Sequence, residues 1–301
     1  MVVASRQVLA KNSRSFSWSA WFLPASRRDD AAVVYALCRL IDDVADETVG
    51  QEKARAELGE LRRELEGGAD ARPLVRTFLD VAERRRLEVA YALELVAGVE
   101  SDLGQVCLRS DRELLRYCYR VAGTVGLMMC AVLGVDDPKA YAHAIDLGVA
   151  MQMTNICRDV LEDARRGRIY LPRRRLEKAG VAPEELLDGS ADRDKVARVV
   201  CDVLDTAEMY YRSADRGLSY IPARSRLAIV VASRVYRAIG VHLRLSGGDA
   251  LAGRTVVGPA AKLWWVMVAM CVYASPTACG LVEPDGHDSE LHRALEGLPG
   301  V

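Results

Sequence analysis

The sequence predicts an all-α protein folded as one domain around a large apolar core. The segments between glycine and proline clusters are long, and their apolar residues recur three and four positions apart, as in helices. Strand-like alternation bounded by hairpin turns is hard to find. The 301 residues contain no serine- and glycine-rich or low-complexity linker. We therefore expect a single domain over residues 1–301, with a core at 1–275 and a C-terminal tail at 276–301.

Clusters of glycine and proline mark the expected breaks between helices. They lie at residues 67–73, 134–138, 180–189 and 246–258, and again from 276. The apolar stripes expected to face the core are clearest at Leu58, Leu61 and Leu65, and at Val196, Val199, Val200 and Val203. A run of consecutive helices follows, which is typical of a helical bundle.

Charge and cysteine usage limit the classes of partner. With 41 basic against 42 acidic side chains, the chain lacks the basic excess that nucleic-acid binding requires. The eight cysteines are scattered through apolar segments without a zinc-ligand spacing, so we expect reduced, buried thiols. Arg6, Lys11 and Arg14 interrupt any apolar run of a signal peptide, which favours a cytoplasmic protein.

Residues 263–282 form the longest uncharged stretch. Ser275, Pro276 and Thr277 interrupt it, and the remaining dozen or so apolar residues are too few for a membrane span. The plain interpretation is a core helix. The alternatives are a wall of an apolar cavity or a surface that touches lipid.

The first chemically informative segment is 35–47, which reads Y-A-L-C-R-L-I-D-D-V-A-D-E. Four of its side chains share one helical face, since they are separated by four, three and four positions: Tyr35, Arg39, Asp42 and Asp46. Two aspartates one turn apart repel each other by roughly 3 kcal/mol at about 5 Å and an effective dielectric of about 20. A divalent cation would reverse the sign of that energy. For this segment alone, an exposed polar face is the alternative.

A second polar stripe consists wholly of oxygen-bearing side chains. Its members are separated by three, four and four positions: Gln152, Asn155, Asp159 and Asp163. Oxygen ligands select hard cations such as Mg²⁺, whereas Zn²⁺ would call for His or Cys, which both stripes lack. The alternative for the two stripes together is a pair of unrelated solvated faces.

If the two stripes face each other across a cavity, Mg²⁺ would join their carboxylates to diphosphate groups. Nearby arginines would add bidentate contacts to phosphate oxygens: Arg39, Arg158, Arg165 and Arg168. The chain has no Walker loop, G-x-G-x-x-G, H-E-x-x-H or G-x-S-x-G motif, so no nicotinamide cofactor is expected. What remains is metal-assisted departure of diphosphate beside an apolar pocket that shelters a carbocation.

The chain resembles the head-to-head prenyl synthases, which include squalene, dehydrosqualene and phytoene synthases. The resemblance covers roughly the first four-fifths of the chain. Its motifs lie at residues 12–16 (N-S-R-S-F), 35–46, 117–126 (Y-C-Y-R-V-A-G-T-V-G), 152–163 and 167–172 (G-R-I-Y-L-P). Residues 207–211 and 235–240 look most like the bacterial phytoene synthases. The resemblance implies an isoprenoid synthase helical bundle around a central apolar cavity.

The resemblance also implies a role for each matching residue. Asp42 and Asp46 would hold Mg²⁺ on one diphosphate. A second set would hold it on the other: Asn155, Asp159 and Asp163. Two or three Mg²⁺ ions would be bound, with Mn²⁺ as a substitute. Further diphosphate contacts would come from Ser13, Ser15, Arg39, Gln152, Asn155, Arg158, Arg168 and, in a loosely matching region, Arg254. Lys262 would match another late basic position of the family.

Four tyrosines would line the cavity and stabilise a cation or steer deprotonation: Tyr35, Tyr119, Tyr170 and Tyr236. For each of them the alternative is an aromatic side chain packed in the core with its hydroxyl satisfied.

The implied reaction joins two molecules of geranylgeranyl diphosphate through a cyclopropylcarbinyl diphosphate, prephytoene diphosphate. Loss of a proton then gives phytoene, in the first committed step of carotenoid biosynthesis. The alternatives are a farnesyl diphosphate enzyme of the dehydrosqualene or squalene type, a cyclase or head-to-tail synthase, and a non-catalytic helical assembly factor. An apolar product also implies transient contact with a membrane, near Trp264 and Trp265.

Overall fold

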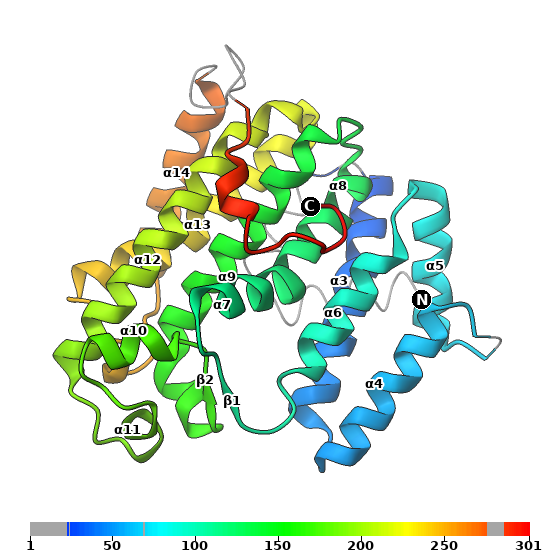
Figure 1. Ribbon diagram of the computed structural model, residues 1–301. Helices are drawn as coiled ribbons and strands as arrows, with labels where there is room; N and C mark the ends of the chain where they lie inside the picture. The colour runs from blue at the N-terminus through cyan, green and yellow to red at the C-terminus, as the bar shows by residue number, and fades with distance from the viewer. Residues whose placement is uncertain (1–22, 24, 69, 276–285) are drawn as a thin grey trace.

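Figure 1 shows a bundle of helices in the computed structural model, which describes residues 23, 25–68, 70–275 and 286–301. Within these residues the extended structure is a two-residue parallel ladder, β1 with β2. The elements, in chain order, are α3 (Ala25–Glu47), α4 (Gln51–Leu65), α5 (Pro73–Arg85), α6 (Val89–Glu100), β1 (Val106–Cys107), α7 (Asp111–Cys118), η1 (Tyr119–Gly123), α8 (Thr124–Leu133), α9 (Lys139–Arg165), β2 (Arg168–Ile169), α10 (Arg173–Lys178), α11 (Pro183–Asp188), α12 (Arg193–Arg216), η2 (Gly217–Tyr220), α13 (Ala223–Leu245), η3 (Ala250–Ala252), α14 (Pro259–Ala274) and η4 (Ser289–His292). The predicted all-α fold is confirmed.

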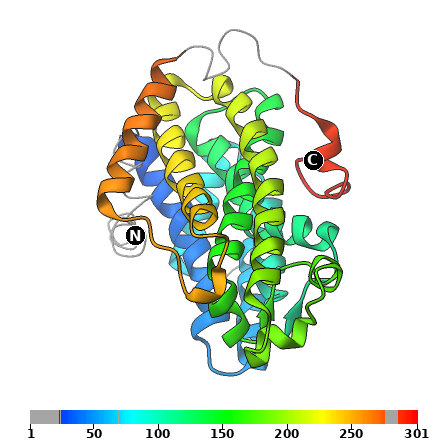
Figure 2. The ribbon, with the colours of Figure 1, turned by 90° about the vertical axis from the view of Figure 1, so that its left-hand side faces the viewer.

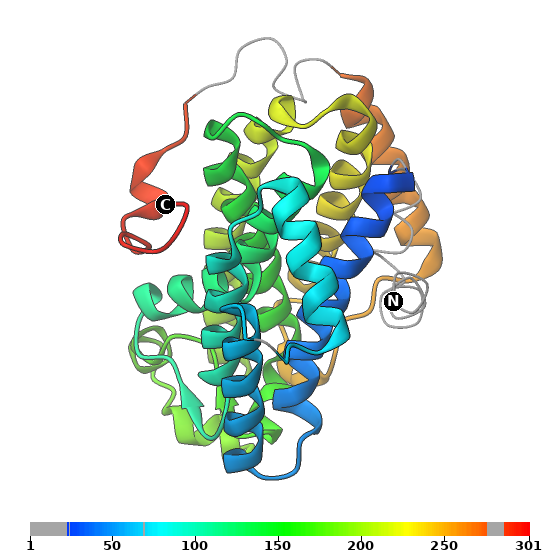
Figure 3. The ribbon, with the colours of Figure 1, turned by 90° about the vertical axis from the view of Figure 1, so that its right-hand side faces the viewer.

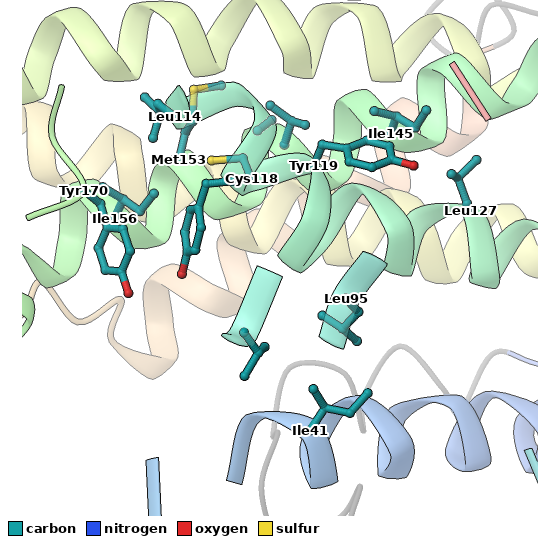
Figure 4. Close-up of a cluster of buried hydrophobic side chains, with 14 of the residues drawn as sticks. Ile41, Leu95, Leu114, Cys118, Tyr119, Leu127, Ile145, Met153, Ile156 and Tyr170 are labelled. Atoms are coloured by element: carbon teal, nitrogen blue, oxygen red, sulfur yellow. The ribbon is translucent and has the colours of Figure 1, made fainter. Parts of the chain in front are cut away.

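The apolar stripes read from the sequence face the core. Leu58, Leu61 and Leu65 are buried on α4, and the four valines of α12 are buried as well. Local signals also set the helix ends: Asp192 accepts hydrogen bonds from the backbone amides of Asp194 and Lys195 and so caps the start of α12. One continuous cluster of buried apolar side chains, part of which Figure 4 shows, extends through most of the bundle.

Helix α9 is the central element of the bundle. It spans 27 residues, about 40 Å at 1.5 Å per residue, and packs against α12, α8, α13 and α7. Its contacts with η1 and α8 are very close. A Cβ added at Gly148 would lie 2.3 Å from the carbonyl oxygen of Ala122 on η1, and one added at Gly126 on α8 would lie 2.3 Å from that of Ala144 on α9. These two glycines let the backbones approach where no larger residue would fit.

Helix α14 lies on the outside of the bundle, packed against α13 (Figure 2). Only Ala269 of this helix is fully buried, whereas Leu263 and Trp264 are 62% and 65% exposed. The plain interpretation of this segment as a core helix is therefore wrong. One face of α14 packs on α13 through Val266, Ala269 and Val272, whereas its largest apolar side chains face outward. Within the described part of the chain, no helix combines the length and hydropathy of a membrane span.

The seven cysteines of the described residues are free thiols. The expected burial holds for Cys118, Cys130 and Cys157 but is wrong for Cys107 and Cys271, which are exposed on β1 and α14. The apolar residues next to these two cysteines in the sequence misled the prediction. The short β1–β2 ladder and the outer helix α14 each leave one face exposed to solvent, and the cysteines lie on those faces.

The C-terminal segment 286–301 returns to the bundle on the side opposite α14 (Figure 3). Leu295 and Leu298 join the buried cluster. The hydroxyl of Tyr210 donates to the Leu291 carbonyl at 2.6 Å, and that of Tyr119 donates to the Pro299 carbonyl. This part of the tail is thus packed into the core.

Candidate functional site

An apolar cavity of about 310 Å³ runs along α9 and is bounded by α3, α8 and α13. Residues of α9 that lie on one helical face line the cavity along most of its length. They begin with Ala140 and His143 at one end and finish with Gln152 and Asn155 at the other. Polar groups gather at the second end: Tyr35, Asp42, Gln152, Asn155 and Tyr236. The structure therefore brings residues of both predicted stripes to one end of a single apolar cavity.

Asp42 lies at the mouth of the cavity on α3. Its side chain is exposed to solvent at this edge, yet the protein packed around it disfavours the charged form and raises its pKa to about 7; the Arg39 guanidinium opposes this rise, and the charge of Asp46 adds to it. Arg39 itself forms an ion pair with Asp43 at 2.5 Å. A raised pKa means that the ionised form of Asp42 lacks enough positive charge around it. A bound cation would supply that charge and stabilise the ionised carboxylate.

Asp46 connects the end of α3 to the segment that follows α9. Its Oδ1 accepts a hydrogen bond from Arg168 Nη1 at 3.2 Å, and its Oδ2 is 3.5 Å from Arg166 Nη1. Both arginines also lower the pKa of Asp163. The two acidic stripes therefore share one pair of guanidinium groups, although they lie more than a hundred residues apart in the chain.

The stripe on α9 is also a strongly charged site. Burial and the neighbouring Asp159 raise the pKa of Asp163 to about 7. Asp159 forms a two-pronged ion pair with Arg158, and Arg254 Nε lies 3.3 Å from its Oδ1. Arg254 therefore lies beside the α9 stripe, although it is almost a hundred residues further along the chain.

Asn155 provides a test of whether the site fits a metal ion. Its Nδ2 donates to Gln152 Oε1 at 3.4 Å, whereas its Oδ1 is buried and has no hydrogen-bond partner among the described residues. A buried carbonyl-type oxygen without a donor is costly, and a hard cation or a metal-bound water would satisfy it. The donor set of oxygens therefore fits Mg²⁺.

The four predicted tyrosines separate into two pairs. Tyr35 and Tyr236 line the cavity, and burial raises the pKa of both hydroxyls. Tyr119 and Tyr170 are buried away from the cavity lining, in the core cluster that Figure 4 shows. Their expected place in the cavity wall is corrected here, because each hydroxyl is held by a protein acceptor on another side.

The acceptor for Tyr170 is Asp102, a residue that the sequence did not single out. The buried Asp102 carboxylate accepts hydrogen bonds from Tyr117 and Tyr170, both at 2.8 Å, and the two rings stack with centroids 4.7 Å apart. Burial raises the pKa of Asp102 to about 6, although the two hydroxyls and Arg168 lower it. The charge of Asp102 thus attracts Arg168, the same arginine that reaches Asp46.

Three residues that the resemblance singled out do not belong to the site described above. Ser13 and Ser15 lie outside the described residues. Lys262 lies on the outer helix α14, partly exposed.

An all-α bundle around an apolar cavity, with two aspartate-bearing helices at its polar end, defines the class of isoprenoid synthases. Dehydrosqualene synthase in a ligand complex superposes on the chain with a TM-score of 0.78 at 26% identity, covering 90% of this chain and 95% of that one. Squalene synthase HpnC from Alicyclobacillus acidocaldarius gives 0.73 at 26% identity, covering 82% and 94%.

The chain belongs to the squalene/phytoene synthase family, whose sequence model matches residues 9–261. Its relatives include a 15-cis-phytoene synthase from a Paracoccus species, 38% identical over 275 residues, which are 87% of this chain and 88% of the relative. A phytoene synthase from Thermus thermophilus is 39% identical over 252 residues, or 82% and 85%.

Proposed function

We propose that this protein is a prenyltransferase that joins two molecules of geranylgeranyl diphosphate head to head and forms phytoene. The observation that carries the proposal is the meeting of the α3 and α9 stripes at the polar end of one apolar cavity, where Asp42 of the first stripe and Gln152 and Asn155 of the second line the wall. The phytoene synthases among its relatives support the product. Ionisation of an allylic diphosphate needs charged groups that stabilise the leaving diphosphate and an adjoining apolar cavity that keeps water from the carbocation.

Mg²⁺ fits the proposed diphosphate site and would be held by Asp42 and Asp46 on one side and by Asn155, Asp159 and Asp163 on the other. When bound, it supplies Lewis-acid stabilisation of the leaving diphosphate. Two or three ions would suit these five ligands, with Mn²⁺ as a substitute.

The arginines of the site would then change partners. Arg168 and Arg166 pair with Asp46, while Arg158 and Arg254 pair with Asp159. With the carboxylates holding the ion, these guanidinium groups would be available to bind phosphate oxygens in a bidentate manner. The same arginines thus neutralise the aspartates in the free protein and would contact diphosphate once substrate is bound.

The cavity would protect the allylic cation. Its lining beyond the polar end is dominated by aliphatic and methionine side chains, which exclude water from the carbocation. Tyr35 and Tyr236 keep their protons because burial raises their pKa, so each presents an aromatic face and a neutral hydroxyl to the cavity. An aromatic face stabilises a cation, and a hydroxyl can orient the base that removes the final proton.

A farnesyl diphosphate enzyme of the dehydrosqualene type is the second candidate, since the superposition on a dehydrosqualene synthase covers most of both chains. Incubation with each labelled allylic diphosphate and Mg²⁺ separates the two, because the products have forty or thirty carbon atoms. A product of any other mass would contradict head-to-head condensation and favour a cyclase or head-to-tail synthase, whereas the absence of any product would favour the non-catalytic interpretation.

Variants of the metal ligands test the site. Asp42→Asn and Asp163→Asn should each lower turnover about 100-fold or more while the helical circular dichroism is retained. Asp80→Asn, an exposed aspartate on α5, is the matched control and should keep wild-type turnover. Near-normal turnover in either ligand variant would refute the assignment of the acidic stripes.

We also propose that this protein is cytoplasmic and touches membranes through α14. Four large apolar side chains are exposed along one face of that helix: Leu263, Trp264, Met267 and Met270. A face of this kind inserts shallowly into a lipid surface, which would accept the apolar product. Trp264→Ser with Met267→Ser should lower binding to liposomes, whereas Leu245→Ser on α13, an isolated exposed leucine, should not.

A further inference from the structure

Three of the four histidines of the chain gather around one buried carboxylate, far from the acidic stripes. Asp146 on α9 is fully buried. Its Oδ1 lies 2.8 Å from His292 Nε2, and its Oδ2 lies 3.0 Å from His287 Nε2. The ring of His143 meets that of His287 edge-on, with centroids 5.3 Å apart.

The cluster joins segments that are distant in the sequence. His287 and His292 belong to the C-terminal segment and lie 141 and 146 residues after Asp146. Asp146 precedes Asp159 by thirteen positions on α9, about 20 Å at 1.5 Å per residue. This cluster is therefore separate from the proposed diphosphate site and lies towards the other end of the same helix.

The charge of Asp146 calls for a positive partner. Among the described residues, its ion-pair partners are His287 and His292. A carboxylate that stays ionised while fully buried must be paired with a cationic histidine or with a metal ion.

The arrangement of donor atoms suits a metal. One ligand atom from each of the three residues lies within 4.8 Å of the other two. Tetrahedral ligands at about 2.0 to 2.1 Å from an ion are about 3.3 Å apart. The two nitrogen to oxygen distances, 2.8 and 3.0 Å and each to a different oxygen of Asp146, differ from this value by a few tenths of an ångström. Two imidazoles with one carboxylate favour Zn²⁺ or a similar transition ion over Mg²⁺.

The surroundings supply an outer shell and an open side. Ser213, fully buried on α12, hydrogen-bonds Asp146 and lies 3.3 Å from His143 Nδ1. Outer hydrogen bonds of this kind orient metal ligands. A pocket of about 670 Å³ lined by His143, His287 and His292 adjoins the cluster, so water can reach a fourth coordination position.

We propose that Asp146, His287 and His292 bind Zn²⁺ or a similar divalent transition ion, and that this ion fastens the C-terminal segment to α9. The ion would act together with the hydroxyl contacts of Tyr119 and Tyr210 to the same segment. The ligands come from α9 and from the C-terminal segment. Metal binding would therefore favour the state in which segment 286–301 is packed on the bundle over the state in which it is detached. The proposal does not depend on the prenyltransferase activity.

Metal content of the full-length protein is the direct test. The protein is stripped with a chelator and dialysed against micromolar Zn²⁺ in millimolar Mg²⁺, which keeps the acidic stripes occupied, and bound zinc is measured by mass spectrometry. We expect about one zinc per chain, with affinity at least about tenfold weaker in His287→Gln and in His292→Gln. His242→Gln, the remaining histidine on α13, is the matched control and should bind like the wild type.

A second measurement follows the tail itself. Amide exchange and proteolysis within 286–301 should slow about tenfold or more when Zn²⁺ is added to the wild type, and should not respond in the two histidine variants. Both histidines lie in the terminal segment, so the bundle can fold without them, and circular dichroism checks this. The proposal is overturned if the wild type binds less than about a tenth of an equivalent of zinc, or if His287→Gln and His292→Gln bind zinc as the wild type does.

Discussion

The affinity of the acidic stripes for a divalent cation should fall steeply between pH 8 and pH 6. Asp42 and Asp163 both have their pKa raised to about 7, mainly by desolvation. A cation binds the ionised carboxylates, so below pH 7 it must displace a proton from each. The ionised fraction of one such group falls from about 90% at pH 8 to about 10% at pH 6. Two independent groups therefore lower the apparent affinity about 100-fold.

Binding of Mn²⁺ followed by electron paramagnetic resonance would measure this change without substrate. The background should carry His287→Gln and His292→Gln, so that the histidine cluster does not add to the signal. In that background, Asp163→Asn removes one titrating group, and the change between pH 8 and pH 6 should shrink to about tenfold. Asp80→Asn should leave the 100-fold change intact.

The outcome that contradicts the reasoning is equally concrete. An affinity that changes less than about threefold over this range would mean that the two carboxyls are already ionised at pH 6 or do not bind the cation. If the affinity of Asp163→Asn still changed 100-fold between pH 8 and pH 6, Asp163 would not be a ligand. The pH dependence would then come from other residues.

Three further predictions concern stability and the tyrosines. In a chelator, Tm should fall as pH rises from 5 to 8, because the raised pKa of Asp42 and Asp163 lets the folded state keep protons that the unfolded state has lost; a Tm that rises over this range would contradict those pKa values. Gly148→Ala should lower the free energy of unfolding in urea by about 1–3 kcal/mol or more, whereas Gly59→Ala, a helical glycine with open space around it, should raise it by up to about 1 kcal/mol. Tyr119→Phe should lower the free energy of unfolding by about 1 kcal/mol and leave kcat within about threefold, since its hydroxyl serves the tail; a kcat loss of about 100-fold would return that hydroxyl to the catalytic set.

Local spacing determined the helices and the chemical character of each stripe. Residues three and four positions apart share a helical face whatever the rest of the chain does, because a helix turns every 3.6 residues. The row of oxygen-bearing side chains from Gln152 to Asp163 could therefore be predicted before the fold was known. The same rule explains why the buried valines of α12 were correctly assigned.

Only the tertiary structure decided how those faces meet. Arg168 reaches Asp46 across 122 residues, and Asp102 accepts from Tyr170 across 68, and no local pattern encodes either contact. The outward direction of the α14 apolar face and the docking of His287 and His292 on Asp146 have the same origin. Helical periodicity acts over a few residues, whereas the choice of which faces pack together is made by burial over the whole chain.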